Sequence, residues 1–166
     1  MIRCIGAEDA EAFLAYFRRL TEVDPERVER PEDVAQISPE KERIWIQSRI
    51  DAERAQEMVV RCVESGDMII GLGEVERAKR WIERHVAEIR FGLLPGYQGE
   101  GHALVRELEE GARMIEIELL VYFHLETQVT GLSSMRSAGY REVGRIPRYY
   151  KREKEYVDRV YLSKPL

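Results

Sequence analysis

A glycine-rich turn between a predicted strand and a predicted helix is the segment of this sequence best suited to bind a ligand. The turn reads Gln98-Gly99-Glu100-Gly101-His102-Ala103. At a helix start the first backbone N–H groups have no partner within the helix, and the helix dipole adds partial positive charge. Glycine lets a ligand approach the backbone closely. The turn could therefore bind a phosphate group, although a plain helix start has the same local pattern.

Two common phosphate-binding loops do not match this turn. No Gly-Lys-Ser or Gly-Lys-Thr follows it, as a Walker loop would require. The third glycine of the dinucleotide-binding fingerprint is missing. The turn also follows strands that look antiparallel, whereas that fingerprint opens a strand–helix–strand unit. The local pattern alone therefore leaves the ligand open.

The elements around the turn predict one α+β domain over residues 1–166, built on a mixed sheet. Apolar alternation, helical spacing and the placement of glycine and proline predict the order β-α-α-β-β-β-α-β-α-β-β. Residues Thr21–Pro39 are expected to be irregular, and the apolar run 115–123 is expected to be the central strand. The predicted strands are 3–5, 57–64, 68–76, 85–94, 115–123, 140–149 and 155–162, and the predicted helices begin near residues 7, 39, 101 and 127.

Composition excludes several classes of protein. The 166 residues carry a net charge of −5, which argues against non-specific nucleic-acid binding. No apolar run is long enough to span a membrane, and the first residues lack the apolar core of a signal peptide. Cys4 and Cys62 fit neither a disulfide framework nor a zinc site. We therefore expect a cytoplasmic protein with no metal site and no membrane contact.

Several motifs agree in order and spacing with one family. The turn from Gln98 to Ala103 matches the Q/R-x-x-G-x-G/A pattern of the GCN5-related N-acetyltransferase (GNAT) superfamily. The opening run 7–10, the Gly139-Tyr140 corner with its following strand, and the order of elements also resemble this superfamily. The resemblance covers essentially the whole chain. It implies a mostly antiparallel mixed sheet flanked by helices.

The resemblance implies that the chain binds acetyl-CoA. The pyrophosphate would bind the backbone amides of the helix start, and the pantetheine would lie along a strand that splays from its neighbour. Gln128 stands where many members have an asparagine that contacts CoA. The implied cofactor-binding residues are Phe91, Gly92, Leu93, Gln98, Gly99, Glu100, Gly101, His102, Ala103, Leu104 and Gln128.

A general base is needed because an amine must lose a proton to attack a thioester. Glu88 is the first candidate, since its strand resembles that of the histone-acetyltransferase branch, whose glutamate is the base; an ion-paired strand residue is the alternative. His124 and Glu126 are reserves. Met135 occupies the position of the usual tyrosine acid and cannot donate a proton. Hydroxyl groups on three tyrosines could replace it: Tyr122, Tyr149 and Tyr150.

The segment between the first two predicted helices would border the acceptor. Residues 21–42 carry eight acidic side chains against three basic ones. A negative rim would favour a cationic acceptor, but a solvated loop is the simpler interpretation. Phe17 and Trp45 are expected in the core rather than in a substrate site. The acidic residues are Glu22, Asp24, Glu26, Glu29, Glu32, Asp33, Glu40 and Glu42.

Three functions are compatible with these features. The leading hypothesis is an acetyl-CoA-dependent N-acetyltransferase that acts on a primary amine of a small molecule or protein. A non-catalytic acyl-CoA-binding or sensory domain is the first alternative, because Met135 leaves the acid position empty. A structural dimerisation module that binds no CoA is the second, and a homodimer is compatible with all three.

Overall fold

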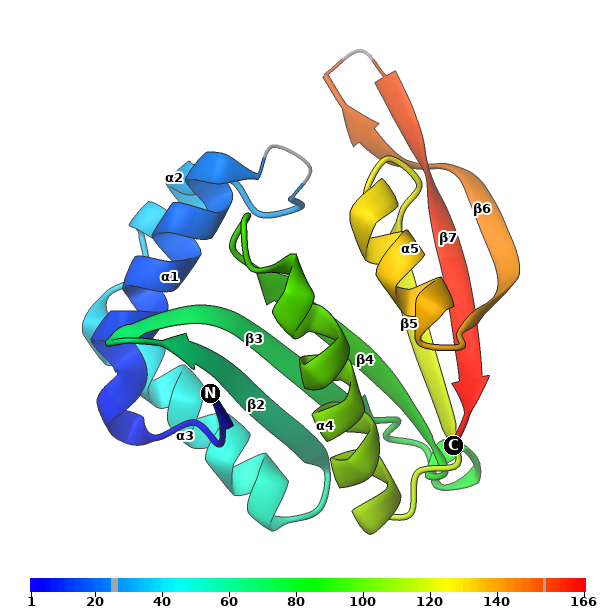
Figure 1. The fold of residues 1–166 in the computed structure, drawn as a ribbon, viewed down its shortest axis with the longest axis horizontal. Coiled ribbons are helices and arrows are strands. Elements are labelled where there is room, and N and C mark those ends of the chain that lie inside the picture. Colours follow the sequence, from blue (N-terminus) through cyan, green and yellow to red (C-terminus); the bar gives the residue numbers. More distant parts are fainter. Residues whose placement is uncertain (25–26, 154) are drawn as a thin grey trace.

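Seven strands form one sheet in the order β1-β2-β3-β4-β5-β7-β6 (Figure 1). The computed structural model describes residues 1–24, 27–153 and 155–166. Neighbouring strands are antiparallel except β4 and β5, which are parallel, so the predicted mostly antiparallel mixed sheet is confirmed. The strands are β1 Ile2–Arg3, β2 Met58–Ser65, β3 Met68–Arg77, β4 Val86–Leu93, β5 Leu119–Leu125, β6 Arg141–Arg152 and β7 Glu155–Pro165.

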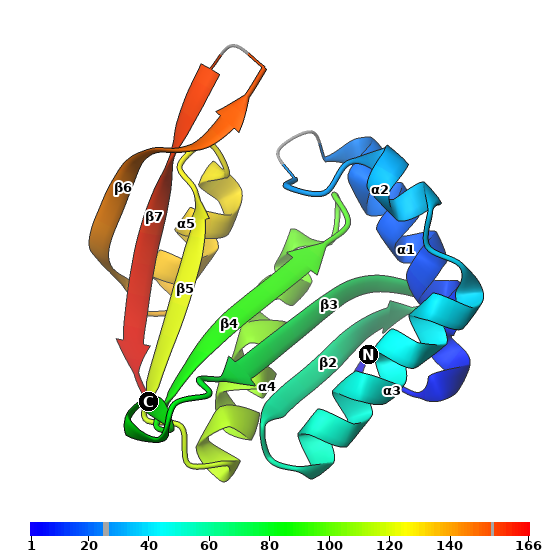
Figure 2. The same cartoon turned by 180° about the vertical axis from the view of Figure 1, so that it is seen from behind.

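Helices cover both faces of the sheet (Figures 1 and 2). One face carries α1 (Ala10–Val23), α2 (Pro31–Ala35) and α3 (Pro39–Arg54). The other carries α4 (Gly101–Met114) and α5 (Val129–Ser137). α4 packs so closely that a Cβ atom on Gly73 of β3 would lie 2.6 Å from Leu108 Cδ1. Glycine at this position therefore allows the helix to contact the sheet.

The sheet opens between β4 and β5. The two strands pair only at Val86 with Leu119, Ala87 with Leu120 and Glu88 with Val121. Beyond Glu88 they diverge, and Figure 2 shows the resulting V between them. Backbone groups along the open edges have no strand partner across the gap, and buried backbone groups need one. The opening is thus a place where another extended molecule can bind.

Two predicted elements differ from the structure. The apolar residues Ile115 and Ile117 belong to the turn that ends α4, where Glu116 adopts a φ of 61° and the Ile117 N–H bonds Ala112 O at 3.0 Å. β5 therefore begins only at Leu119, although it lies inside the sheet as expected. In the segment predicted to be irregular, α1 continues to Val23 and Pro31 starts the short α2. In the part of the chain described, no helix is long and apolar enough to cross a membrane.

Candidate functional site

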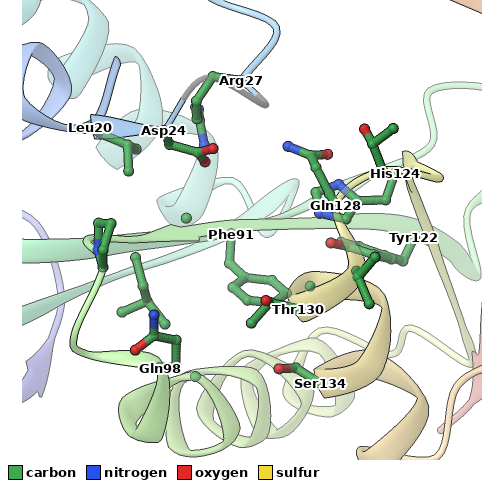
Figure 3. Close-up of a pocket in the computed structure, with 17 residues that line it drawn as sticks. Leu20, Asp24, Arg27, Phe91, Gln98, Tyr122, His124, Gln128, Thr130 and Ser134 are labelled. Carbon is green, nitrogen blue, oxygen red and sulfur yellow. The ribbon is translucent and has the colours of Figure 1, made fainter. Parts of the chain in front are cut away.

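A cavity of about 330 Å³ fills the open end of the V (Figure 3). β4 and β5 form its walls, the start of α4 and one face of α5 close it, and the end of α1 borders it. Six of the predicted cofactor-binding residues line it: Phe91, Gly92, Leu93, Gln98, Gly101 and Gln128. The fold thus brings together two segments that lie some thirty residues apart in the sequence.

The glycine turn presents an open backbone surface to this cavity. Gly96 has a φ of 92°, a conformation that favours glycine, and its N–H donates to Gln98 Oε1 at 3.1 Å. A Cβ atom on Gly99 would meet nothing within 4 Å, and one on Gly101 would lie 3.2 Å from Leu93 Cδ1. The space beside Gly99 is therefore open to a ligand that approaches the start of α4, whereas the Leu93 side chain limits the space beside Gly101.

The other predicted residues of the turn do not line the cavity. They are Gly99, Glu100, His102, Ala103 and Leu104. His102 is exposed, whereas the Leu104 side chain is fully buried in the core. These residues can contribute only through their backbone groups. The Glu100 N–H already donates to Tyr97 O at 3.0 Å, so not every amide of the turn is free.

Two side-chain contacts fix the part of β4 that lies beyond its pairing with β5. The Tyr16 hydroxyl of α1 donates to the Gly92 carbonyl at 2.8 Å. Across the gap, the Phe91 ring stacks on Tyr122 of β5, with centroids 5.9 Å apart. Tyr122 lines the cavity, unlike Tyr149 and Tyr150 of β6, so it is the hydroxyl among the three candidates that reaches this site.

Glu88 lies where the pairing of β4 with β5 ends. Residues alternate along a strand, so Glu88 shares a face with Arg90 and Gly92, the face covered by α1 and α3. Glu88 Oε1 lies 3.5 Å from Arg90 Nε, and its side chain is 37% exposed. Burial raises the pKa of Glu88, and the positive charges of Arg90 and Arg159 oppose that shift. It lines neither this cavity nor the one on the opposite side of β4, so a proton that moves between Glu88 and either cavity would need a bridging water.

The reserve bases differ in their surroundings. His124 lines the cavity, and burial lowers its pKa to about 4, with Arg27 adding to the shift. The imidazole is therefore neutral at pH 7. Glu126 instead lies at the surface, where its carboxylate accepts hydrogen bonds from Arg145 Nη1 at 3.0 Å and from the Asp158 N–H at 3.2 Å. Of the two, only His124 faces the candidate site.

The sequence drew attention to Met135 of α5, but other residues of this helix line the cavity. Met135 is fully buried in the core, so it cannot take part in chemistry. Thr130, Gly131 and Ser134 face the cavity instead. Figure 3 shows Thr130 and Ser134 on the side of α5 that faces Phe91. Sequence reasoning missed Ser134, although its spacing of three from Gly131 places both on one helix face.

A second cavity, of about 360 Å³, lies on the opposite side of β4 between α1, α3 and the segment that joins them. It shares Arg27, Phe91 and Gly92 with the first cavity. Phe17 and Trp45 pack against the core as predicted, but they also line this cavity. The two cavities therefore lie side by side, with these three residues in the wall of each.

The acidic segment is only partly a solvated loop. Glu22, Glu32, Asp33 and Glu40 are exposed, as that interpretation requires. Glu29 lines the second cavity and Asp24 the first. Glu42 is 3% exposed and also lines the second cavity, so for this residue the interpretation is wrong. Glu26 lies outside the described residues.

Solved acetyltransferases share this architecture along the whole chain. An acetyltransferase of the GNAT family from Streptococcus pneumoniae superposes with a TM-score of 0.89 at 16% identity, covering 100% of this chain and 99% of the other. A ribosomal-protein-alanine N-acetyltransferase from Brucella melitensis gives 0.84 at 20% identity, with 100% and 99% covered. A GNAT superfamily phosphinothricin acetyltransferase from Sinorhizobium meliloti, in complex with acetyl-CoA, gives 0.80 at 16% identity, with 100% and 88% covered.

The comparison of sequences adds no match to this structural likeness. No protein-family model matches the chain, and no curated protein matches it either. The likeness therefore lies in the arrangement of strands and helices. The resemblance predicted from Gln98–Ala103 is confirmed at the level of the fold: this chain has the fold of the GCN5-related N-acetyltransferase superfamily.

Proposed function

We propose that this protein is an acetyl-CoA-dependent N-acetyltransferase that acts on a primary amine. One observation carries the proposal: two cavities on opposite sides of β4 share Phe91 and Gly92 in their walls. The first cavity has the glycine turn at its end and suits a long phosphate-bearing thioester. The second suits a small amine. An acyl donor and an acceptor could therefore meet without either passing through the other's cavity.

The residues of the first cavity fit acetyl-CoA. The open space beside Gly99 would admit the pyrophosphate at the helix start, where the dipole favours anions. The unpaired edge of β4 at Phe91–Leu93 would offer backbone hydrogen bonds to the pantetheine amides. Gln128 lies on the facing wall. When bound, acetyl-CoA would supply a thioester whose carbon–sulfur bond breaks as the acceptor nitrogen forms its bond to the acetyl carbon.

The chain's own contribution is to position the amine and move its proton. A lysine-like amine, with a pKa near 10.4, is almost wholly protonated at pH 7, so a base raises the neutral fraction at the site. We assign this role to Glu88, acting through water, because burial raises its pKa toward that of an effective base. His124 is the alternative base. The Ser134 and Tyr122 hydroxyls face the same cavity and could donate to the departing sulfur.

A thiol leaving group also tolerates the loss of the usual acid. Its pKa is near 8.5 by comparison with cysteine, so much of it can leave as thiolate at neutral pH. The buried Met135 therefore does not exclude turnover. Homodimerisation and a cytoplasmic location remain predictions.

An acetyl-CoA consumption screen tests the proposal. Polyamines, amino acids, aminoglycosides and N-terminal peptides are offered as acceptors, and release of free thiol is followed. Binding is measured separately, as the increase in the free energy of unfolding when CoA is added. Mass action predicts an increase of about 2.7 kcal/mol at a CoA concentration of a hundred times Kd. Stabilisation without thiol release from any acceptor would favour the sensory domain. No stabilisation would favour the dimerisation module.

A further inference from the structure

The second cavity holds a buried carboxylate without a partner. Glu42, in the first turn of α3, is 3% exposed, and its Oε1 atom makes no hydrogen bond with any described residue. No ion pair among the described residues includes it. Burial raises its pKa because the charged form loses hydration. A buried carboxylate in this state is unfavourable, so a ligand that donates to it would gain affinity.

The other charges in the wall of this cavity are already paired. Arg49 Nε lies 3.0 Å from Glu74 Oε1, and Arg90 lies 2.9 Å from Glu76 and 3.3 Å from Glu74, so each of the two guanidiniums has a carboxylate of its own. Arg27 pairs with Glu29 at 2.9 Å. Each guanidinium that lines the cavity thus has a carboxylate beside it. The charge left for a ligand is the negative one on Glu42, which favours a cationic group over an anionic one.

Between Glu42 and the open part of β4 the wall is largely apolar. The Phe17 and Trp45 rings lie 6.2 Å apart and nearly perpendicular, and Leu72 of β3 also lines the cavity. The volume of about 360 Å³ suits a small molecule. Gly92, which also lines the first cavity, marks the end of this cavity nearest to it. The cavity thus combines a reaction end, an apolar middle and an anionic end.

From this arrangement we infer that the acceptor is a small diamine. One amine would lie beside Gly92 as the nucleophile, the methylene chain would lie along Phe17 and Trp45, and the second amine, as an ammonium, would bind Glu42. This inference rests on the proposed function, because it names the acceptor of the same site. Glu42 is then a specificity residue rather than a catalytic one.

Three ligands of matched length test the inference: 1,5-diaminopentane, pentylamine and 5-aminopentanoate. They share a five-carbon chain and differ at one end, which is an ammonium, a methyl or a carboxylate group. Their affinities are measured by calorimetry and their kcat/KM values by thiol release. We expect the diamine to exceed pentylamine by about 10- to 100-fold, the range of one charge-assisted hydrogen bond. 5-Aminopentanoate should be the weakest.

A matched pair of variants isolates Glu42. Glu42→Gln keeps the side-chain volume and removes the charge, so it should abolish the preference for the diamine and leave pentylamine within a few-fold. Glu40→Gln changes an exposed carboxylate in the same helix turn and should keep the preference. Equal binding of diamine and pentylamine by the wild type would overturn the inference, as would a retained preference in Glu42→Gln or tightest binding of 5-aminopentanoate.

The two proposals fail in different ways. Stabilisation by CoA does not involve Glu42, so its absence would count against the acetyltransferase assignment alone. Calorimetric binding of the diamine needs no turnover, so it tests Glu42 even where no acetyl transfer is seen. CoA binding with normal transfer to pentylamine, but no gain from a second ammonium, would keep the enzyme and remove the diamine.

Discussion

Glu88 and His124 are both partly withdrawn from water, and burial moves their pKa values in opposite directions. The charged form is the disfavoured one in each case, so the carboxyl pKa rises and the imidazole pKa falls to about 4. Glu88 becomes a better base, whereas His124 becomes a weaker one that is always neutral at pH 7. The residue that lines the cavity is thus the poorer base, and the better base lies outside the cavity lining.

Glu88→Gln should lower kcat by about 10²–10⁴ at neutral pH, because the amide cannot accept the proton. The KM for acetyl-CoA should stay unchanged. The loss should shrink as pH rises and more of the acceptor is neutral, over a wider range for a lysine-like amine than for an α-amine. Steady-state kinetics from pH 6 to 10 measure this.

Glu76→Gln is the matched control for that experiment. Glu76 is the register partner of Glu88 on β3, and both side chains are 37% exposed. It should leave kcat within a few-fold. Wild-type turnover in Glu88→Gln would move the assignment to His124 or a water chain.

The pKa of His124 makes stability depend on pH. The unfolded state takes up a proton near pH 6.5 and the folded state only near pH 4, so stability is greatest above pH 6.5 and falls as pH drops through this window. Between pH 7 and pH 5 the loss should be about 2 kcal/mol. Urea unfolding at the two pH values measures it.

His124→Gln should remove that part of the pH dependence. His85→Gln, at an exposed position, should keep it. An unchanged pH dependence in His124→Gln would mean that the imidazole titrates normally in the folded protein.

At the scale of elements, β4 and the start of α4 form the candidate cofactor site together. β4 pairs fully with β3 but pairs with β5 over only three residues, so its last residues have a free edge. The turn after β4 then returns the chain to begin α4 beside this edge. A single strand–turn–helix unit thus presents an open strand edge and a helix start to the same cavity.

Gly101→Asp should abolish CoA binding and leave the protein folded. Gly101 has a φ of −61°, which aspartate adopts without strain, and a carboxylate in the first helical turn is favourable. The same carboxylate would occupy the space proposed for the pyrophosphate and repel it. Calorimetric titration with CoA and a thermal melt measure the two effects.

Gly101→Ala separates charge from bulk. Its Cβ atom would meet only Leu93 Cδ1, the far end of a flexible side chain, at 3.2 Å. It should weaken CoA binding by a few-fold. Unchanged affinity in Gly101→Asp would contradict the assignment of phosphate binding to this turn.

At the scale of the whole molecule, an ion pair ties the two arms of the V together. Lys164 of β7 donates to Glu109 of α4 at 2.7 Å and to the Ala138 carbonyl after α5 at 2.8 Å. The Glu109 side chain is 8% exposed and that of Lys164 is 23% exposed. This ion pair therefore joins the arm that carries α4 to the arm that carries α5.

Lys164→Met should destabilise the protein by about 3 kcal/mol, because it leaves the buried Glu109 carboxylate without its main partner. Arg113, 4.0 Å from Glu109, can compensate only in part. The double variant Lys164→Met/Glu109→Leu should recover most of the loss. Urea unfolding of the four proteins of this cycle measures the coupling, and a loss below about 1 kcal/mol in the single variant would show that the pair is effectively solvated.

The sequence by itself predicted the features that depend on neighbouring residues. The glycine turn before α4 and the end of α5 at Gly139, which has a φ of 93°, follow from local backbone chemistry. The order of strands and helices follows from periodicity, and the agreement of several motifs in order and spacing predicted the superfamily fold. The predicted start of β5 was wrong because the apolar residues Ile115 and Ile117 belong to the turn that ends α4.

Only the tertiary structure decided which distant residues share a site. Met135 drew attention by its place in a motif, but the rotation of α5 buries it and turns Ser134 toward the cavity. Glu42 belonged to a charged run that looked solvated, yet the packing of α3 against α1 and β2 removes it from water. Burial depends on which elements pack together, and a run of charged residues in the sequence does not show which elements will pack against it. The physical reason is that pairing and exposure of a charge are properties of its neighbours in space.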